Sequence, residues 1–208
     1  AAAAELRKKP SDTVGQAAQT AASALLRGAR GNSGVILSLL FRGFAKAIKD
    51  RETIDGRDLA IALDFGVAAA YKAVMKPAEG TILTVSRLSA AAAAAAARED
   101  AAIESVLEKA IAEGLVALEN TTEQNPVLKK AGVVDSGGKG FLVILQGMLD
   151  ELQGKPMPEG ADLPQKQEKA DFAALGDEDI TFTFDTVFIV RKDDPNVNLE
   201  PYRAYLNS

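Results

Sequence analysis

Apolar residues recur every three or four positions along most of residues 12–152, and this spacing constrains the fold more than any other feature of the sequence. The pattern predicts helices over residues 12–28, 34–48, 55–76, 81–97, 103–118 and 138–152, with a short helical stretch over 126–130. Aromatic residues make up 5% of the chain and tryptophan is absent, so a core must consist of Leu, Ile, Val and Ala side chains. This composition favours close-packed helices, and we expect an all-α antiparallel helical bundle or barrel.

The character of the sequence changes after Gly154. Residues 155–169 are rich in proline, glutamine and charge, which is typical of a linker. Apolar and polar residues then alternate from Ile180 to Phe184 and lead into residues 187–190, which predicts a strand. We therefore expect a helical domain over 1–155, a linker over 156–178 and, over 179–208, the incomplete start of a second, α/β domain.

Charge and composition exclude several classes of function. The net charge is −5 and the Lys and Arg residues are scattered, so we expect no nucleic-acid partner. No apolar segment is long enough to span a bilayer, and the N-terminal charges follow the small residues, the reverse of a signal peptide, so we expect a cytoplasmic protein. Cys and His are absent, which removes thiol catalysis, Cys-based zinc sites and a histidine base. The remaining groups suit phosphate chemistry.

Three of the connections between the predicted helices contain several glycines or a glycine beside a hydroxyl residue. We call them the first loop (28–34, GARGNSG), the third loop (77–81, PAEGT) and the fifth loop (134–140, VDSGGKG). Short connections make successive helices antiparallel, so odd-numbered loops share one end of a bundle. Each of these loops precedes a helix N-terminus, where unpaired N–H groups and the helix dipole attract anions. The spacing therefore predicts a polyphosphate site at that end.

Simpler interpretations of the same residues stay open. Ser, Thr, Asn and Asp at helix starts commonly act as caps, and glycine there commonly serves a turn. Neither the dinucleotide fingerprint nor the P-loop pattern is met, since Lys139 is followed by Gly140. Arg30 could neutralise phosphate or cap the end of the preceding helix. Lys139 lies in the first turn of a helix, where a cation opposes the dipole, and this favours an acidic or phosphate partner.

Three segments resemble a known family. The strings GARGNSGVILSLLFRGF (28–44), AYKAVMKPAEGTILTV (70–85) and PVLKKAGVVDSGGKGF (126–141) are similar to the DhaL-like ATP-binding domain of bacterial fatty acid kinase subunits of the FakA type, which is related to the ATP-binding subunit of dihydroxyacetone kinase. The resemblance covers about residues 12–155. Residues 182–191 (FTFDTVFIVR) are similar to the opening strand of that family's middle domain.

The resemblance implies a helical barrel that holds ATP and two magnesium ions at one end. The residues that it implies for the nucleotide are Gly31, Asn32, Ser33 and Gly34 in the first loop, Gly80, Thr81 and Leu83 at the third, and Asp135, Ser136, Gly137 and Gly138 at the fifth. The family's magnesium ligands lie in an aspartate-rich segment similar to PDGDTGTN, and nothing like it occurs between Ala1 and Gly28. We therefore assign no metal ligand in this chain, neither Glu79 nor Asp135, and no catalytic residue.

The resemblance also implies a function. We expect an ATP-dependent phosphotransferase, inactive as this segment alone, that transfers the γ-phosphoryl group of ATP to a fatty acid carboxylate on a separate fatty-acid-binding partner subunit. Two alternatives stay open: the ATP-binding subunit of a dihydroxyacetone (glycerone) kinase, and a non-catalytic nucleotide-binding or interaction module. The predicted second domain favours the fatty acid kinase, because the small sugar-kinase subunit lacks it. A homodimer is compatible with the sequence.

Overall fold

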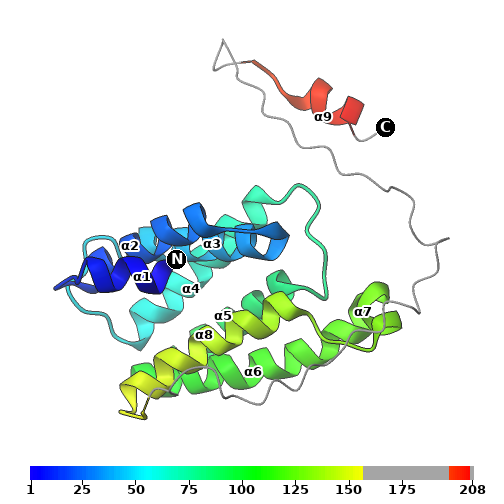
Figure 1. Ribbon diagram of the computed structural model, residues 1–208. Helices are drawn as coiled ribbons and strands as arrows, with labels where there is room; N and C mark the ends of the chain where they lie inside the picture. Colours follow the sequence, from blue (N-terminus) through cyan, green and yellow to red (C-terminus); the bar gives the residue numbers. More distant parts are fainter. Residues whose placement is uncertain (157–196, 207–208) are drawn as a thin grey trace. The chain divides into compact units, whose positions relative to one another are not determined.

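The computed structural model describes residues 1–156 and 197–206, and all regular secondary structure in those two ranges is helical (Figure 1). The helices are α1 (Ala2–Lys8), α2 (Val14–Gly28), α3 (Gly31–Ala47), α4 (Gly56–Ala73), α5 (Ile82–Glu99), α6 (Ile103–Gln124), α7 (Pro126–Ala131), α8 (Ser136–Leu152) and α9 (Glu200–Leu206). The prediction of an all-α bundle is confirmed. The predicted strand and most of the predicted linker lie outside the described residues.

Side-chain caps explain where several helices begin. Thr13 accepts a hydrogen bond from the Gln16 amide at the start of α2, and Asp55 accepts one from the Asp58 amide at the start of α4. Asn125 precedes Pro126, which occupies the first turn of α7, where its missing N–H is not needed. These caps set the helix boundaries near the positions that the sequence predicts.

Three helix boundaries differ from the prediction by three residues or more. α4 ends at Ala73 instead of residue 76. α3 begins at Gly31 instead of Gly34, so the first loop is shorter than the glycine spacing indicates. α6 continues to Gln124 instead of ending near Leu118, although the added turn is mostly polar. The reason is Thr121, whose side chain is fully buried and whose hydroxyl donates to the Leu118 carbonyl at 2.6 Å. A polar residue that bonds its own helix can continue that helix while breaking its apolar pattern.

The core lies among α3, α4, α5, α6 and α8, and successive helices pack against one another from α2 to α6. The alanine run 90–97 forms part of α5, with Ala90, Ala93, Ala96 and Ala97 buried against its neighbours. Alanine favours helix and also allows neighbouring helices to approach closely. The core therefore consists of small and medium aliphatic side chains, as the composition predicts.

Glycines bring α3 and α4 into direct backbone contact. A Cβ on Gly66 would lie 2.6 Å from the carbonyl oxygen of Leu40, and a Cβ on Gly43 would collide with the carbonyl of Phe65. Larger side chains at either position would force the two helices apart. This close packing fixes the direction of α3 and hence the position of its first turn.

The helices α1–α8 belong to one compact unit, and α9 belongs to a second unit that begins at Leu175. In α9 the Glu200 amide donates to the side-chain oxygen of Asn198, and Tyr202 and Tyr205 are exposed. Within the described residues, none of the helices combines the length and apolar character that crossing a membrane requires.

Candidate functional site

The structure brings the three glycine-containing loops together at one end of the bundle. Ser33, in the first turn of α3, lies against Gly137 in the first turn of α8: a Cβ on Gly137 would lie 2.8 Å from the Ser33 hydroxyl oxygen. Thr121 joins the other two loops, because its hydroxyl accepts a hydrogen bond from the Asp135 amide at 3.1 Å and its carbonyl oxygen would lie 3.0 Å from a Cβ on Gly80. The prediction that the odd-numbered loops share an end is confirmed.

The third loop has a defined backbone conformation. Gly80 adopts a left-handed φ of 72°, and its N–H donates to the Thr84 hydroxyl at 2.9 Å. The Thr81 hydroxyl donates to the Ala78 carbonyl at 2.8 Å and accepts from the Leu83 amide at 3.3 Å. Thr81 is therefore the N-cap of α5, and the polar groups of this turn are bonded to one another.

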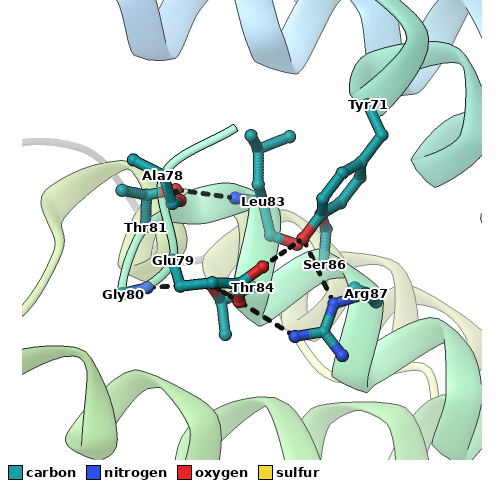
Figure 2. Close-up of polar contacts among 9 residues, drawn as sticks. All are labelled: Tyr71, Ala78, Glu79, Gly80, Thr81, Leu83, Thr84, Ser86 and Arg87. Carbon is teal, nitrogen blue, oxygen red and sulfur yellow. Dashed lines mark hydrogen bonds and ion pairs between the residues drawn. The ribbon is translucent and has the colours of Figure 1, made fainter. Parts of the chain in front are cut away.

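A charged hydrogen-bond network lies beside the third loop. Figure 2 shows Tyr71, Thr84 and Arg87 pointing toward Glu79. One carboxylate oxygen of Glu79 accepts from the Thr84 hydroxyl at 2.8 Å and from the Arg87 guanidinium at 2.9 Å, and the other accepts from the Tyr71 hydroxyl at 3.2 Å. Arg87 Nε also donates to the Tyr71 hydroxyl at 3.2 Å. The network thus links the last turns of α4, the third loop and the first turns of α5.

The pKa values of this network reflect its hydrogen bonds. Partial burial alone would raise the pKa of Glu79, but hydrogen bonds from Thr84 and Arg87 outweigh it and hold that pKa below its usual value. Burial raises the pKa of Tyr71, so its hydroxyl stays protonated and can donate to Glu79. Glu79 is therefore a carboxylate at neutral pH with both oxygens engaged by side chains.

The fifth loop is organised by Asp135. Its carboxylate accepts from the Gly138 amide at 2.6 Å, and the Ile82 and Gly137 amides also lie near it. Its own amide donates to the Thr121 hydroxyl at 3.1 Å, which ties the loop to the C-terminal turn of α6. Burial raises the pKa of Asp135, and these amides offset only part of that effect. The half-buried carboxyl group of Asp135 thus lies at the N-termini of two helices, α5 and α8.

The first loop lacks such a cap. α3 follows Arg30 without a side-chain cap hydrogen bond, and Gly31 begins it with a left-handed φ of 63°. The Arg30 guanidinium donates to the Ala29 carbonyl at 2.8 Å, just beyond the end of α2, in agreement with the capping role considered for this residue. Gly31, Asn32 and Ser33 are exposed. No side chain is therefore bonded to the first amides of α3, and the residues that carry them are exposed.

The residues implied by the family resemblance fall into two groups. Those that are exposed or half-buried, and so can reach a ligand directly, are Gly31, Asn32, Ser33, Gly34, Thr81, Asp135, Ser136 and Gly137. Gly80 and Gly138 are buried and offer backbone only. Leu83 is 1% exposed and packs in the core, so its side chain supports the third loop from the core side.

Sequence reasoning missed four residues that shape the site. Thr84, Arg87, Thr121 and Tyr71 carried no motif, yet Thr84, Arg87 and Tyr71 form the network around Glu79 and Thr121 accepts from the Asp135 amide. The one local signal was for Thr84, a hydroxyl three positions after Thr81.

The described residues do not fit the magnesium ions that the resemblance implies. No group of three or more carboxylates lies together within residues 1–156 and 197–206. The two carboxylates near the loops are already engaged, Asp135 by backbone amides and Glu79 by three side chains. Magnesium prefers several oxygen ligands in octahedral geometry, which this set does not supply.

Fold and site together define an all-helical domain in which three helix starts meet at one end. A model of the family described as the DAK2 domain matches residues 1–150, and the chain therefore belongs to the DAK2-domain family. This places it with the ATP-binding type of subunit in the dihydroxyacetone kinase family and confirms the family resemblance.

Similar proteins occur in several bacteria. Protein YloV of Bacillus subtilis is 43% identical over 196 residues, which cover 91% of this chain and 35% of that protein. An uncharacterized protein of Staphylococcus saprophyticus is 44% identical over 186 residues, covering 87% and 34%, and one of Staphylococcus aureus is 42% identical over 192 residues, covering 90% and 35%. The chain thus spans about a third of the length of these relatives.

Proposed function

We propose that this chain binds the phosphates of ATP at the start of α3 and is the nucleotide-binding part of a kinase. One observation carries the proposal: no side chain caps the first turn of α3, its first residues are exposed, and it lies directly against the fifth loop. An uncapped helix start attracts anions through its N–H groups and its dipole. Membership of the DAK2-domain family supports ATP as that anion.

In this proposal the three loops have different tasks. Gly31, Asn32, Ser33 and Gly34 bind phosphate oxygens, while Thr81, Ser136 and Gly137 form the adjoining wall. Gly80, Leu83, Asp135 and Gly138 hold that wall in place. Phosphoryl transfer depends mainly on positioning and charge stabilisation, which backbone amides and hydroxyls supply without a histidine or cysteine. Magnesium, where it takes part, requires ligands other than the engaged carboxylates described above.

We further propose that the phosphoryl acceptor is a fatty acid carboxylate presented by a separate fatty-acid-binding subunit. The three loop strings resemble fatty acid kinase subunits, and the similarity to YloV extends over 196 residues, beyond the 150 that the DAK2 domain covers. That extent favours a protein with a further domain over the single-domain subunit of a sugar kinase.

A thermal-shift titration tests nucleotide binding. ATP at millimolar concentration should raise the melting temperature of the chain, because a ligand that binds only the folded state stabilises it by RT ln(1 + [L]/Kd). The variant Asn32→Ala/Ser33→Ala should bind ATP about tenfold more weakly through loss of its polar contacts. Thr53→Ala, an exposed hydroxyl substitution in the loop between α3 and α4, is the matched control. Equal ATP affinity in the double variant and the control would contradict the proposal.

A further inference from the structure

Glu79 lies just before the two residues that form the turn into α5, and its contacts exceed those of an ordinary surface carboxylate. It receives hydrogen bonds from Tyr71, Thr84 and Arg87, residues that belong to two different helices. Figure 2 shows the three side chains pointing toward it from α4 and α5. The carboxylate therefore joins the end of α4 to the start of α5 across the loop.

Thr84 transmits this contact to the backbone of the loop. Its side chain is buried, its hydroxyl donates to Glu79 at 2.8 Å, and the same oxygen accepts from the Gly80 N–H at 2.9 Å. A hydroxyl has one proton to donate, so the carboxylate fixes its direction and leaves the oxygen lone pair for Gly80. The left-handed conformation of Gly80 depends on this bond.

The C-terminal end of α6 packs closely against Gly80. A Cβ on Gly80 would lie 2.9 Å from the Cβ of Gln124 and 3.0 Å from that of Asn125. The turn is therefore held from two sides, by packing against α6 and by the hydrogen bond through Thr84. Without that bond, packing alone would have to fix the direction of the Gly80 N–H.

We propose that Glu79 is a positioning residue that orders the Gly80–Thr81 turn for ATP before the nucleotide binds, acting through the Thr84 hydroxyl and braced by Arg87 and Tyr71. The inference rests on the proposed function, since it assigns this role toward ATP. This positioning role differs from a general contribution of Glu79 to the stability of the fold. The Glu79 and Arg87 side chains are 49% and 44% exposed, and exposed ion pairs add little to global stability.

The first experiment measures the order of the turn in the absence of nucleotide. Amide hydrogen exchange of the 208-residue chain, followed residue by residue by NMR, should show a protected Gly80 N–H. In Glu79→Gln the exchange of Gly80 should be about tenfold faster, because one charged hydrogen-bond acceptor is lost. Amides in the core of α6 should be unchanged. Unchanged exchange at Gly80 would overturn the inference whether or not the chain binds ATP.

Substitutions at Thr84 separate the hydrogen bond from the shape of the side chain. Thr84→Ser keeps the hydroxyl and should retain slow exchange at Gly80. Thr84→Val keeps the size, removes the hydroxyl and should reproduce the fast exchange of Glu79→Gln. Equal exchange in the serine and valine variants would show that packing alone orders the turn and would overturn the inference.

The second experiment measures ATP affinity by calorimetric titration. Glu79→Gln should raise the Kd for ATP about tenfold and leave the melting temperature of the free protein nearly unchanged. Asp58→Asn is the matched control, since Asp58 forms an ion pair with Arg51 at the other end of α4. Faster exchange at Gly80 with unchanged ATP affinity would overturn the role toward the nucleotide. A wild-type chain that binds no ATP would contradict the proposed function instead, and the exchange data would still decide whether Glu79 orders the turn.

Discussion

The starts of α3, α5 and α8 lie together, yet only α3 has no side-chain cap. Thr81 caps α5, and Asp135 caps α8 and also lies near the first amide of α5. The glycine-containing loops therefore lead into two kinds of helix start. At α3 no side chain bonds to the first amides, whereas at α5 and α8 a side chain already does.

In the proposed function, the uncapped start of α3 binds the ligand and the capped starts of α5 and α8 support the site. A carboxylate of the chain itself occupies the place where an external anion would meet α5 and α8, so these starts form a preorganised wall. Preorganised groups do not have to be rearranged when a ligand binds, which favours affinity. In the proposed function, the exposed residues of the first loop make the direct contact with phosphate.

The largest expected effect is the loss of stability when the Asp135 cap of α8 is removed. Asp135→Ala removes the acceptor for the Gly138 amide, and with it the carboxylate near the amides of Ile82 and Gly137, and should lower the free energy of unfolding by about 2 kcal/mol. Asn32→Ala, on the uncapped side, should change it by less than about 0.5 kcal/mol. Urea denaturation of both variants measures the two values. Similar losses would show that the two kinds of helix start do not differ.

A smaller effect should distinguish Gly31 from Gly80, the left-handed glycines of the first and third loops. Gly80 is enclosed by α6, whereas nothing lies within 4 Å of a Cβ on Gly31. Gly31→Ala should cost about 1 kcal/mol from backbone strain alone, and Gly80→Ala should cost at least about 1 kcal/mol more because of the added collision. The comparison of denaturation midpoints tests this order. A reversed order would contradict the division into an open and an enclosed loop.

The smallest effect is a difference in pH dependence between the fifth and third loops. Burial raises the pKa of Asp135, so its contribution to stability is complete below the unfolded value near 3.8 and is lost as pH rises through the higher folded value. The pKa of Glu79 is lowered because the bonds from Thr84 and Arg87 outweigh burial, so its contribution is present above about 4.5 and is lost as pH falls through the folded value.

The two neutral variants should therefore respond in opposite directions. Relative to wild type, Asp135→Asn should gain stability as pH rises from 3 to 6, while Glu79→Gln should lose it. Denaturation curves at several pH values give both differences. A change of the same sign in both variants would contradict the environments described for these carboxylates.

The sequence predicted the helices and the meeting of the loops, because apolar spacing and loop parity are local patterns. It also marked Asp135 and Thr81 as residues at helix starts. It could not show that Asp135 lies near the Ile82 amide, because these residues are far apart in the chain. The Glu79 network joins residues closer in the chain, but it depends on how α4 and α5 pack beside the third loop, which no local pattern shows. Thr121 bonds the carbonyl three residues before it, and its hydroxyl breaks the apolar spacing on which the helix prediction depends. Which helix starts are capped by their own side chains is therefore a property of the tertiary structure.

The most direct test of the central claim is amide hydrogen exchange of the chain with and without ATP. The account predicts that ATP protects the amides of Gly31, Asn32 and Ser33. It predicts that the amide of Gly138, which already bonds to Asp135, and that of Ile82, which lies near it, are slow in both states. New protection at Ile82 and Gly138 with no change in the first turn of α3 would contradict it.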